Sequence, residues 1–224
     1  MIRHRLPKSW LPTYDSFRFE LRQSIGRFRQ RNQSLATDQS YIHFGCGNQI
    51  LDGFVNTDVF GNQKAQSGID LRHPLPVESN TFEGAYAHHV VEHLFYEDAH
   101  RFFGECFRIL KPKGILRIVV PDLGKFLSAY SKSGTTNEMF EWIPKHHLPK
   151  GCSTQLELID HLARGEYFNE HRSLWDDETL LQRVSETGFS KVRIVEVGSS
   201  ENKMLNQLDC MAWADHSIAI EAVK

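Results

Sequence analysis

The chain has 224 residues, of which 40% are hydrophobic and 24% are charged, a composition typical of a folded globular domain that argues against a disordered, collagenous or coiled-coil protein. The formal net charge is −2, but residues 1–33 hold eight basic and two acidic side chains, which leaves 18 basic and 26 acidic side chains in the remainder. No apolar run approaches the roughly 18 residues that a membrane span requires, and the N-terminus lacks the apolar core of a signal peptide, so we expect a cytoplasmic protein.

The first predicted element is a basic helix over residues 16–31. Four apolar side chains recur at helical spacing between arginines: Phe17, Leu21, Ile25 and Phe28. Such a helix either packs its apolar stripe on the main domain or contacts an anionic partner, such as a membrane surface, a nucleic acid or a phosphorylated substrate, and both alternatives stay open. We take residues 1–38 as this helix with its linker and residues 39–224 as the main domain.

The main domain alternates predicted strands and helices. Short apolar runs bounded by turn signals predict buried strands at 41–44, 54–58, 82–88 and 115–120. Residues 96–110 carry apolar side chains on one helical face and end just before a proline and a glycine, so they predict an amphipathic helix. A strand, a helix and a strand of these lengths imply a right-handed parallel crossover. A later helix at 178–187 and strands at 191–197 and 217–223 complete an α/β sheet whose last two strands can pair antiparallel.

Residues 131–177 differ in texture from the rest of the chain. Tryptophan, histidine and proline recur there in irregular surroundings, among them His146, His147 and His171. We predict an insertion that lies over the sheet, because such insertions commonly shape substrate pockets.

Chemistry is first indicated by the segment Phe44-Gly45-Cys46-Gly47-Asn48, which directly follows a predicted strand. Glycines at that point let the backbone approach a ligand that a Cβ would push away. Asp58 ends the next strand, where a carboxylate can accept both hydroxyls of a ribose, and Asp70-Leu71 closes a short third segment. A glycine loop followed by two acids in this order indicates a nucleoside site at the carboxyl ends of the strands.

Two further segments complete a recognisable pattern. A loop over 70–82 leads into a strand and then into Ala87-His-His-Val-Val-Glu-His-Leu94, and Phe107-Arg-Ile-Leu-Lys-Pro-Lys-Gly-Ile-Leu-Arg-Ile118 joins a helix, a turn and a strand. From about residue 41 to about residue 223, the chain resembles the class I methyltransferases of the methyltransferase type 11 kind.

The resemblance implies a Rossmann-like α/β fold with a seven-stranded, mostly parallel sheet whose last strand is antiparallel. It also implies S-adenosylmethionine as the cofactor. The cofactor contacts it implies are Phe44, Gly45, Cys46, Gly47, Asp58, Asp70, Leu71 and His88. The chain is also similar to bacterial members linked to polysaccharide biosynthesis, which implies a small-molecule or sugar-containing acceptor.

Two departures from the family pattern bear on activity. His43 stands where the family has an acidic residue two positions before the first glycine, so support for the methionine amino group must come from elsewhere. Residues 46–53 are also too few for the usual first crossover helix, which we expect to be reduced to a turn. A protein that keeps the fold as a catalytically inactive binding or regulatory module is therefore the alternative to an active enzyme.

A rival pattern lies in the same region. His89-Val-Val-Glu92-His93 has the spacing that puts two zinc-ligating histidines and a glutamate on one helical face in some hydrolases. The pattern follows directly on a strand rather than lying within a long helix, and the four cysteines are scattered without a C-x-x-C pair. We therefore expect no metal site.

For catalysis, methyl transfer is an in-line displacement that needs alignment and, for a hydroxyl or amine acceptor, a base. Histidine suits that base because its ordinary pKa is near neutrality. We select His171 as the first candidate and His89 as the second. No Asn-Pro-Pro-Tyr or Asp-Pro-Pro-Tyr motif of nucleic-acid methyltransferases is present, so a nucleic-acid acceptor is not expected.

Overall fold

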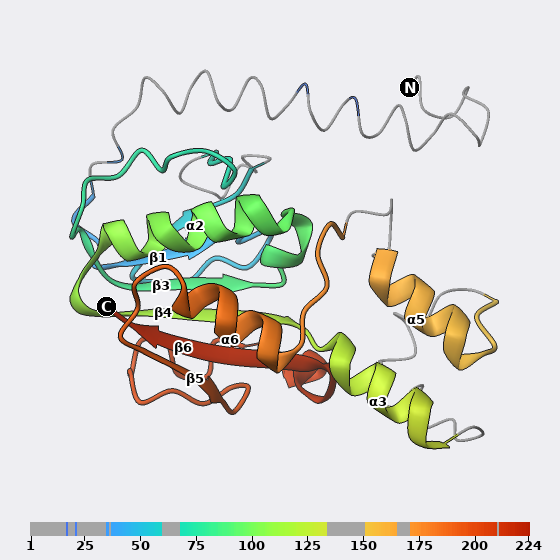
Figure 1. Cartoon of the computed structure of the whole chain (residues 1–224). Coiled ribbons are helices and arrows are strands. Elements are labelled where there is room, and N and C mark those ends of the chain that lie inside the picture. Colours follow the sequence, from blue (N-terminus) through green and yellow to red (C-terminus); the bar gives the residue numbers. More distant parts are fainter. Residues whose placement is uncertain are drawn as a thin grey trace.

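The computed structural model describes residues 17, 21, 35, 37–59, 68–133, 151–164, 171–209 and 211–224 (Figure 1). These residues build an α/β domain around one mixed sheet. Its strands are β1 (Tyr41–Phe44), β2 (Phe54–Thr57), β3 (Phe82–His88), β4 (Leu110–Pro121), β5 (Lys191–Val195) and β6 (Ser217–Val223). The strand order is β2-β1-β3-β4-β6-β5. Strands β1 to β4 run parallel, whereas β6 is antiparallel to both of its neighbours, as expected for the last strand.

The described residues form six strands rather than the seven that the resemblance implies. The third segment, which carries Asp70 and Leu71, runs as a turn. The Asp70 carboxylate accepts the backbone N–H of Arg72 at 3.1 Å, and the Asp70 carbonyl accepts the N–H of His73 at 3.2 Å. An aspartate that bonds the backbone two residues on favours a turn over an extended strand.

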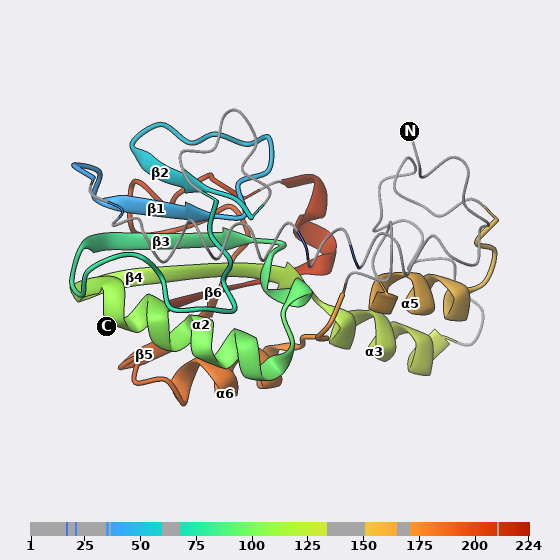
Figure 2. The ribbon, with the colours of Figure 1, turned by 90° about the horizontal axis from the view of Figure 1, so that it is seen from above.

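Helices cover the sheet and its carboxyl edge. They are η3 (Val91–His93), α2 (Tyr96–Ile109), α3 (Leu123–Ser133), α5 (Gln155–Arg164), α6 (Asp177–Ser185) and η4 (Met211–His216). Figures 1 and 2 show α2 and α6 side by side on one face, and α3 and α5 together beyond the carboxyl end of β4. Both α3 and α5 fall within the predicted insertion or next to it, and they share a small core of their own around Phe126, Leu158 and Ile159.

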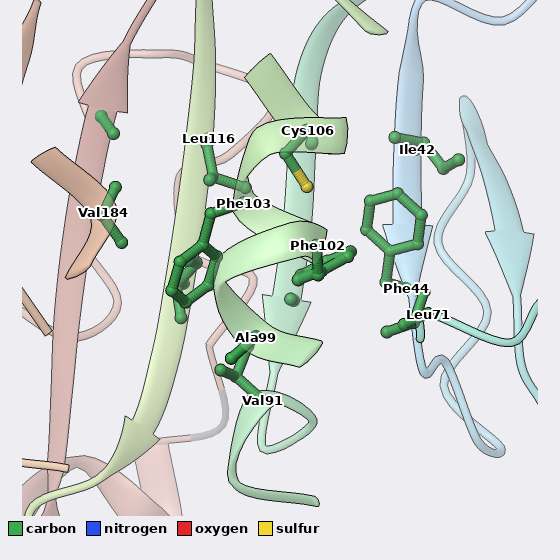
Figure 3. Packing of buried hydrophobic residues seen from close by; sticks show 14 of the residues in the cluster. Ile42, Phe44, Leu71, Val91, Ala99, Phe102, Phe103, Cys106, Leu116 and Val184 are labelled. Carbon is green, nitrogen blue, oxygen red and sulfur yellow. The ribbon is translucent and has the colours of Figure 1, made fainter. Parts of the chain in front are cut away.

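Helix α2 forms because its apolar residues recur three and four positions apart. Ala99, Phe102, Phe103 and Cys106 are buried against the sheet (Figure 3), and Ile109 is buried as well. The rings of Phe102 and Phe44 meet edge to face at 5.1 Å between centroids. Each such buried aromatic side chain contributes roughly 1.5–3 kcal/mol of transfer free energy. This packing fixes the orientation of β1 and β3, whose carboxyl ends carry the predicted site.

Little of the predicted basic helix lies within the described residues. Phe17 and Leu21 are helical, and their exposed fractions are 64% and 51%. The other positions of residues 16–31 lie outside the described residues. Among the residues that the structure describes, no helix is long and apolar enough to cross a bilayer.

Candidate functional site

The carboxyl ends of β1 to β4 meet at one edge of the sheet, because these strands are parallel and adjacent. Gly45 and Gly47 follow β1 with φ angles of +61° and +49°, in the left-handed region that favours glycine. The Cys46 N–H donates to the Thr57 carbonyl at 2.9 Å, and the Gly47 N–H donates to Asp58 Oδ2 at 3.0 Å. The glycine loop thus folds against the end of β2 and places Asp58 beside it, as the sequence predicts.

The first crossover is a turn rather than a helix, and Asn56 on β2 holds it. Asn56 Oδ1 accepts the Leu51 N–H at 2.9 Å, while Asn56 Nδ2 donates to the carbonyls of Leu51 at 2.9 Å and Phe54 at 3.1 Å. His43 is the cross-strand neighbour of Asn56, and its Nδ1 lies 3.2 Å from the same Oδ1. One side-chain amide therefore replaces the stabilising role of a crossover helix.

His43 is buried and neutral. Burial lowers its pKa to about 4, against the opposing effect of the hydrogen bond with Asn56. A neutral imidazole cannot replace the charge of the acid that the family has at this position. His43 instead completes the buried polar pair that supports the short crossover.

The two glycines differ in the space in front of them. Among the described residues, a Cβ built on Gly47 would meet nothing within 4 Å. A Cβ on Gly45 would lie 2.3 Å from a methyl group of Val90, so that side chain occupies the space over Gly45. Asp58 accepts one N–H from Gly47, and a carboxylate has capacity for further donors. An adenosyl ligand therefore fits at Gly47 and Asp58, whereas contact at Gly45 requires Val90 to move.

Of the other predicted cofactor residues, some are buried in the hydrophobic core and others lie near the carboxyl ends of the strands. Phe44 and Leu71 are buried in the main hydrophobic cluster (Figure 3). Cys46 is buried as well, and burial raises the pKa of its thiol. The Asp70 carboxylate is held by the guanidinium of Arg72, with Nε to Oδ1 at 3.0 Å and Nη2 to Oδ2 at 3.1 Å. The structure thus gives Asp70 a partner in its own turn, and its contact with a cofactor stays a prediction.

At the end of β3, His88 and His89 lie stacked with ring centroids 4.6 Å apart. Burial lowers the pKa of both imidazoles, and for His89 the other nearby histidines lower it further. His88 Nε2 is buried and has no hydrogen-bond partner among the described residues. His89 has a φ of +51°, and its Nε2 lies 2.9 Å from Ser217 Oγ at the start of β6. A buried, unpaired ring nitrogen at the sheet edge is an atom that a ligand can satisfy.

His171, the first candidate base, is brought to this edge by the segment 171–175. The N–H groups of Arg172 and Ser173 both donate to the Glu92 carbonyl, at 2.7 and 3.2 Å. His171 Nδ1 donates to the Leu162 carbonyl at 2.7 Å, so this nitrogen carries the proton and Nε2 is the basic atom of the neutral ring. One donor atom from each of Glu92, His93 and His171 lies within 4.8 Å of the other two.

The H-x-x-E-H pattern therefore folds differently from a hydrolase helix. His89 precedes η3 in a left-handed conformation, and η3 spans only three residues, so His89 and His93 do not share one face of a long helix. His171, distant in sequence, joins Glu92 and His93 instead.

A small pocket opens at the end of β4, beside the histidines. Its polar lining includes Glu92, Asp122, His171 and Ser173, and Trp175 lies among its apolar residues. Burial raises the pKa of the Asp122 carboxyl. Trp175 Nε1 is buried without a hydrogen-bond partner among the described residues. Sequence reasoning missed Asp122 and Trp175, which meet through a parallel bridge between segments more than fifty positions apart. His146 and His147 lie outside the described residues.

Comparison with known proteins finds a family match for one segment of this domain. Residues 59–118 match the family model described as "Methyltransferase domain". The matched segment contains the turn at Asp70, strand β3, the histidines and most of β4, and it begins directly after Asp58. A search of curated proteins finds no match.

Solved structures give only distant similarities. A methyltransferase from Thermotoga maritima, described as a possible histamine N-methyltransferase, is 14% identical with a TM-score of 0.46, over 96% of this chain and 99% of its own. A methyltransferase from Archaeoglobus fulgidus is 16% identical with a TM-score of 0.48, over 97% of this chain and 100% of its own. Phosphoethanolamine N-methyltransferase 2 of Haemonchus contortus is 14% identical with a TM-score of 0.47, over 90% of this chain and 52% of its own. Values this low carry no information on acceptor or mechanism.

The match assigns residues 59–118, about a quarter of the chain, to a methyltransferase domain.

Proposed function

We propose that this protein methylates a small-molecule or glycan-type acceptor by in-line transfer, with the cofactor at the ends of β1, β2 and β3 and the reacting group of the acceptor in the pocket at the end of β4. The observation that carries the proposal is the glycine loop closed on Asp58, with no described residue within 4 Å of a Cβ built on Gly47. S-adenosylmethionine, when bound, supplies a methyl group activated by its sulfonium.

On the cofactor side, each residue has a separate task. The left-handed backbone at Gly47 lets a nucleoside approach without a Cβ in its path. Asp58 accepts hydrogen bonds from ribose hydroxyls, and His88 Nε2 offers a buried ring nitrogen to the ligand. Because His43 is neutral, the amino group of the methionine part is bound by backbone carbonyls or by another side chain.

On the acceptor side, the pocket favours a polar group. The indole N–H of Trp175 is a buried donor that an acceptor oxygen can satisfy. His171 presents the unprotonated Nε2 of its fixed tautomer and so can take the proton of a hydroxyl or amine. His89, bonded to Ser217 and beside Glu92, is the second candidate. The pocket has a volume of about 10 Å³, room for about one water molecule, so only the reacting group of an acceptor can enter it.

The first test is calorimetric titration with S-adenosylmethionine and S-adenosylhomocysteine. Asp58→Ala removes charge-assisted hydrogen bonds and should weaken binding by about 1–3 kcal/mol. Gly47→Arg should abolish binding, because its side chain would lie in the path of a nucleoside that approaches the loop. Asp52→Ala, an exposed aspartate of the same crossover, is the matched control and should bind as the wild type does. Unchanged affinity in Asp58→Ala and Gly47→Arg would reject this site.

His171→Ala tests the acceptor side. The variant should keep its cofactor affinity and lose turnover, because His171 lies by the pocket at the end of β4 rather than at the glycine loop. Single-turnover methyl transfer to extracted small molecules and sugar intermediates measures the difference. Loss of cofactor binding in this variant would place His171 in the other half of the site.

A catalytically inactive binding or regulatory protein is the second candidate. Two contacts favour it: Val90 covers Gly45, and Arg72 holds the Asp70 carboxylate that a cofactor would otherwise contact. Saturable cofactor binding without turnover on any acceptor extract would support this candidate, whereas turnover would exclude it.

The basic segment is a second, separate part of the proposal. We assign residues 16–31 to contact with an anionic membrane surface, because Phe17 and Leu21 are helical and exposed between arginines. Packing of the apolar stripe on the domain is the alternative.

A further inference from the structure

Glu92, His93 and His171 form a cluster of metal-ligand type. One donor atom from each lies within 4.8 Å of the others, although His171 is far from the other two in the sequence. Tetrahedral zinc with bonds of about 2.1 Å separates its ligand atoms by roughly 3.4 Å, so small side-chain rotations would close the set around one ion. Glu92 is buried to 2% exposure, and a buried carboxylate is stabilised by a cation.

The backbone holds this cluster in place before any ion binds. Glu92 and His93 are neighbours in the short helix η3. The segment that carries His171 is fastened to the same turn, because the N–H groups of Arg172 and Ser173 donate to the Glu92 carbonyl and Ser173 Oγ donates to the Val91 carbonyl at 3.4 Å. All three ligands are thus attached to one hydrogen-bonded unit.

His171 also has the supporting contact that metal-bound histidines usually have. Its Nδ1–H donates to the Leu162 carbonyl at 2.7 Å, and its own backbone N–H donates to the Arg164 carbonyl at 3.2 Å. A carbonyl on the outer nitrogen fixes the tautomer and ring orientation and directs Nε2 at the ion. Glu92 and His171 both line the small pocket at the end of β4.

We propose that Glu92, His93 and His171 bind one divalent transition-metal ion. Two imidazoles and one carboxylate suit Zn²⁺ and the neighbouring first-row ions, whereas Mg²⁺ and Ca²⁺ prefer oxygen ligands alone. Three protein ligands leave a coordination position open, as in catalytic rather than structural zinc sites. Glu92 and His171 also line the small pocket with Asp122, Ser173 and Trp175, so a bound ion would have room there for one oxygen ligand such as water or a hydroxyl.

The sequence predicted no metal site, and the proposed ligands also differ from those of the H-x-x-E-H pattern. In that pattern His89 and His93 are the ligands, whereas here His89 lies outside the donor set, 3.8 Å from Glu92 Oε1, with Nε2 engaged by Ser217. In the metal-bound protein His171 Nε2 is occupied, so the loss of turnover expected for His171→Ala would there come from loss of a metal ligand rather than of a base. Use of the ion to hold an acceptor hydroxyl rests on the proposed function, while metal binding itself does not.

The test is titration of the full chain, stripped with a chelator, with Zn²⁺ and separately with Mn²⁺ and Mg²⁺. We expect one Zn²⁺ per chain, weak binding of Mg²⁺, and a rise in Tm of about 5–10 °C at Zn²⁺ concentrations about 100-fold above Kd. Glu92→Gln, His93→Gln and His171→Gln should each lower Zn²⁺ affinity at least tenfold, whereas His100→Gln, a half-exposed histidine on α2, should not.

A wild-type measurement guards against variants that fail to fold. Addition of Zn²⁺ should shift the ring NMR signals of His93 and His171 and leave those of His100 in place. The proposal is overturned if the wild type binds no stoichiometric Zn²⁺, if all three variants bind it as the wild type does, or if the ring signals of His93 and His171 do not respond. None of these measurements uses S-adenosylmethionine, so they stand or fail independently of methyl transfer.

Discussion

His43 is a buried histidine whose protonation state affects the stability of the fold. The imidazole lies in the sheet against Asn56 Oδ1 and the ring of Tyr86, whose centroid is 5.1 Å away. Burial keeps it neutral with a pKa of about 4, so below neutral pH the unfolded chain binds a proton there that the folded chain does not. The stability contributed by neutral His43 is complete above the unfolded pKa of 6.5 and falls as the pH drops toward 4.

We therefore expect the unfolding free energy to depend on pH, and we expect His43→Gln to weaken this dependence. Between about pH 7.5 and about pH 5, the wild type should lose about 2 kcal/mol more unfolding free energy than His43→Gln, as follows from a folded pKa of about 4 and an unfolded value of 6.5. Urea unfolding at both pH values measures the difference. His100→Gln, the same substitution at a half-exposed histidine on α2, is the control. Equal losses in wild type and His43→Gln would show that His43 is not buried as a neutral group.

At the scale of elements, β4 carries a buried ionic network that joins it to the loop before η4. Arg117 is fully buried, and its guanidinium donates to Asp209, to Glu221 on β6 at 3.0 Å and to the Ser199 carbonyl at 2.8 Å. Burial opposes ionisation of Asp209, but hydrogen bonds from Arg117 and the Gly198 N–H outweigh it and lower the pKa. The network fixes this loop against the face of the sheet opposite α2.

Arg117→Met should therefore destabilise the fold by about 3–5 kcal/mol, because it leaves two buried carboxylates without their cation. Arg164→Met, which breaks an exposed pair with Asp160 on α5, is the matched control and should cost at most about 1 kcal/mol. Urea unfolding free energies of Arg117→Met, of Asp209→Asn and of the double variant Arg117→Met/Asp209→Asn test the coupling. Additive effects of the two substitutions in the double variant would contradict a coupled buried pair.

The sequence predicts helices and strands that have a clear apolar periodicity. It does not predict contacts between residues that are distant along the chain. Strand β3 and strand β6 were predicted with their observed bounds, and α2 within one residue, because apolar spacing and turn residues are local signals. Strand β4 starts five residues earlier than expected, since Lys113, at φ +69°, is absorbed into the strand as an irregularity instead of ending it.

The glycine loop and Asp58 were predictable because residues at the ends of adjacent parallel strands must meet at one edge. The pairing of Asp70 with Arg72 was not, since spacing alone does not tell a ligand-binding carboxylate from one that closes its own turn. His171 was chosen by residue type and region, but its approach to Glu92 and His93 depends on hydrogen bonds between segments nearly eighty positions apart. Such contacts leave no periodic trace in a single sequence.

At the scale of the whole molecule, charge is divided between the segment 1–33 and the rest of the chain. That segment carries eight basic and two acidic side chains, while the remainder has a net charge of −8. Within it, Phe17 is 64% and Leu21 51% exposed. A cationic segment with exposed apolar residues is attracted to anionic lipid, whereas the acidic remainder is repelled by it.

The full chain should therefore co-sediment with vesicles of anionic phospholipid at low salt and dissociate as salt is raised, because screening shortens the reach of the charges. Phe17→Ser/Leu21→Ser removes apolar insertion and Arg18→Gln/Arg22→Gln removes attraction, so each pair should weaken binding while leaving S-adenosylmethionine affinity unchanged. Vesicles of neutral phosphatidylcholine are the control and should bind none of these proteins appreciably. Binding lost only in the arginine variant would point to charge attraction without insertion, and binding unchanged in both variants would remove this segment from any membrane contact.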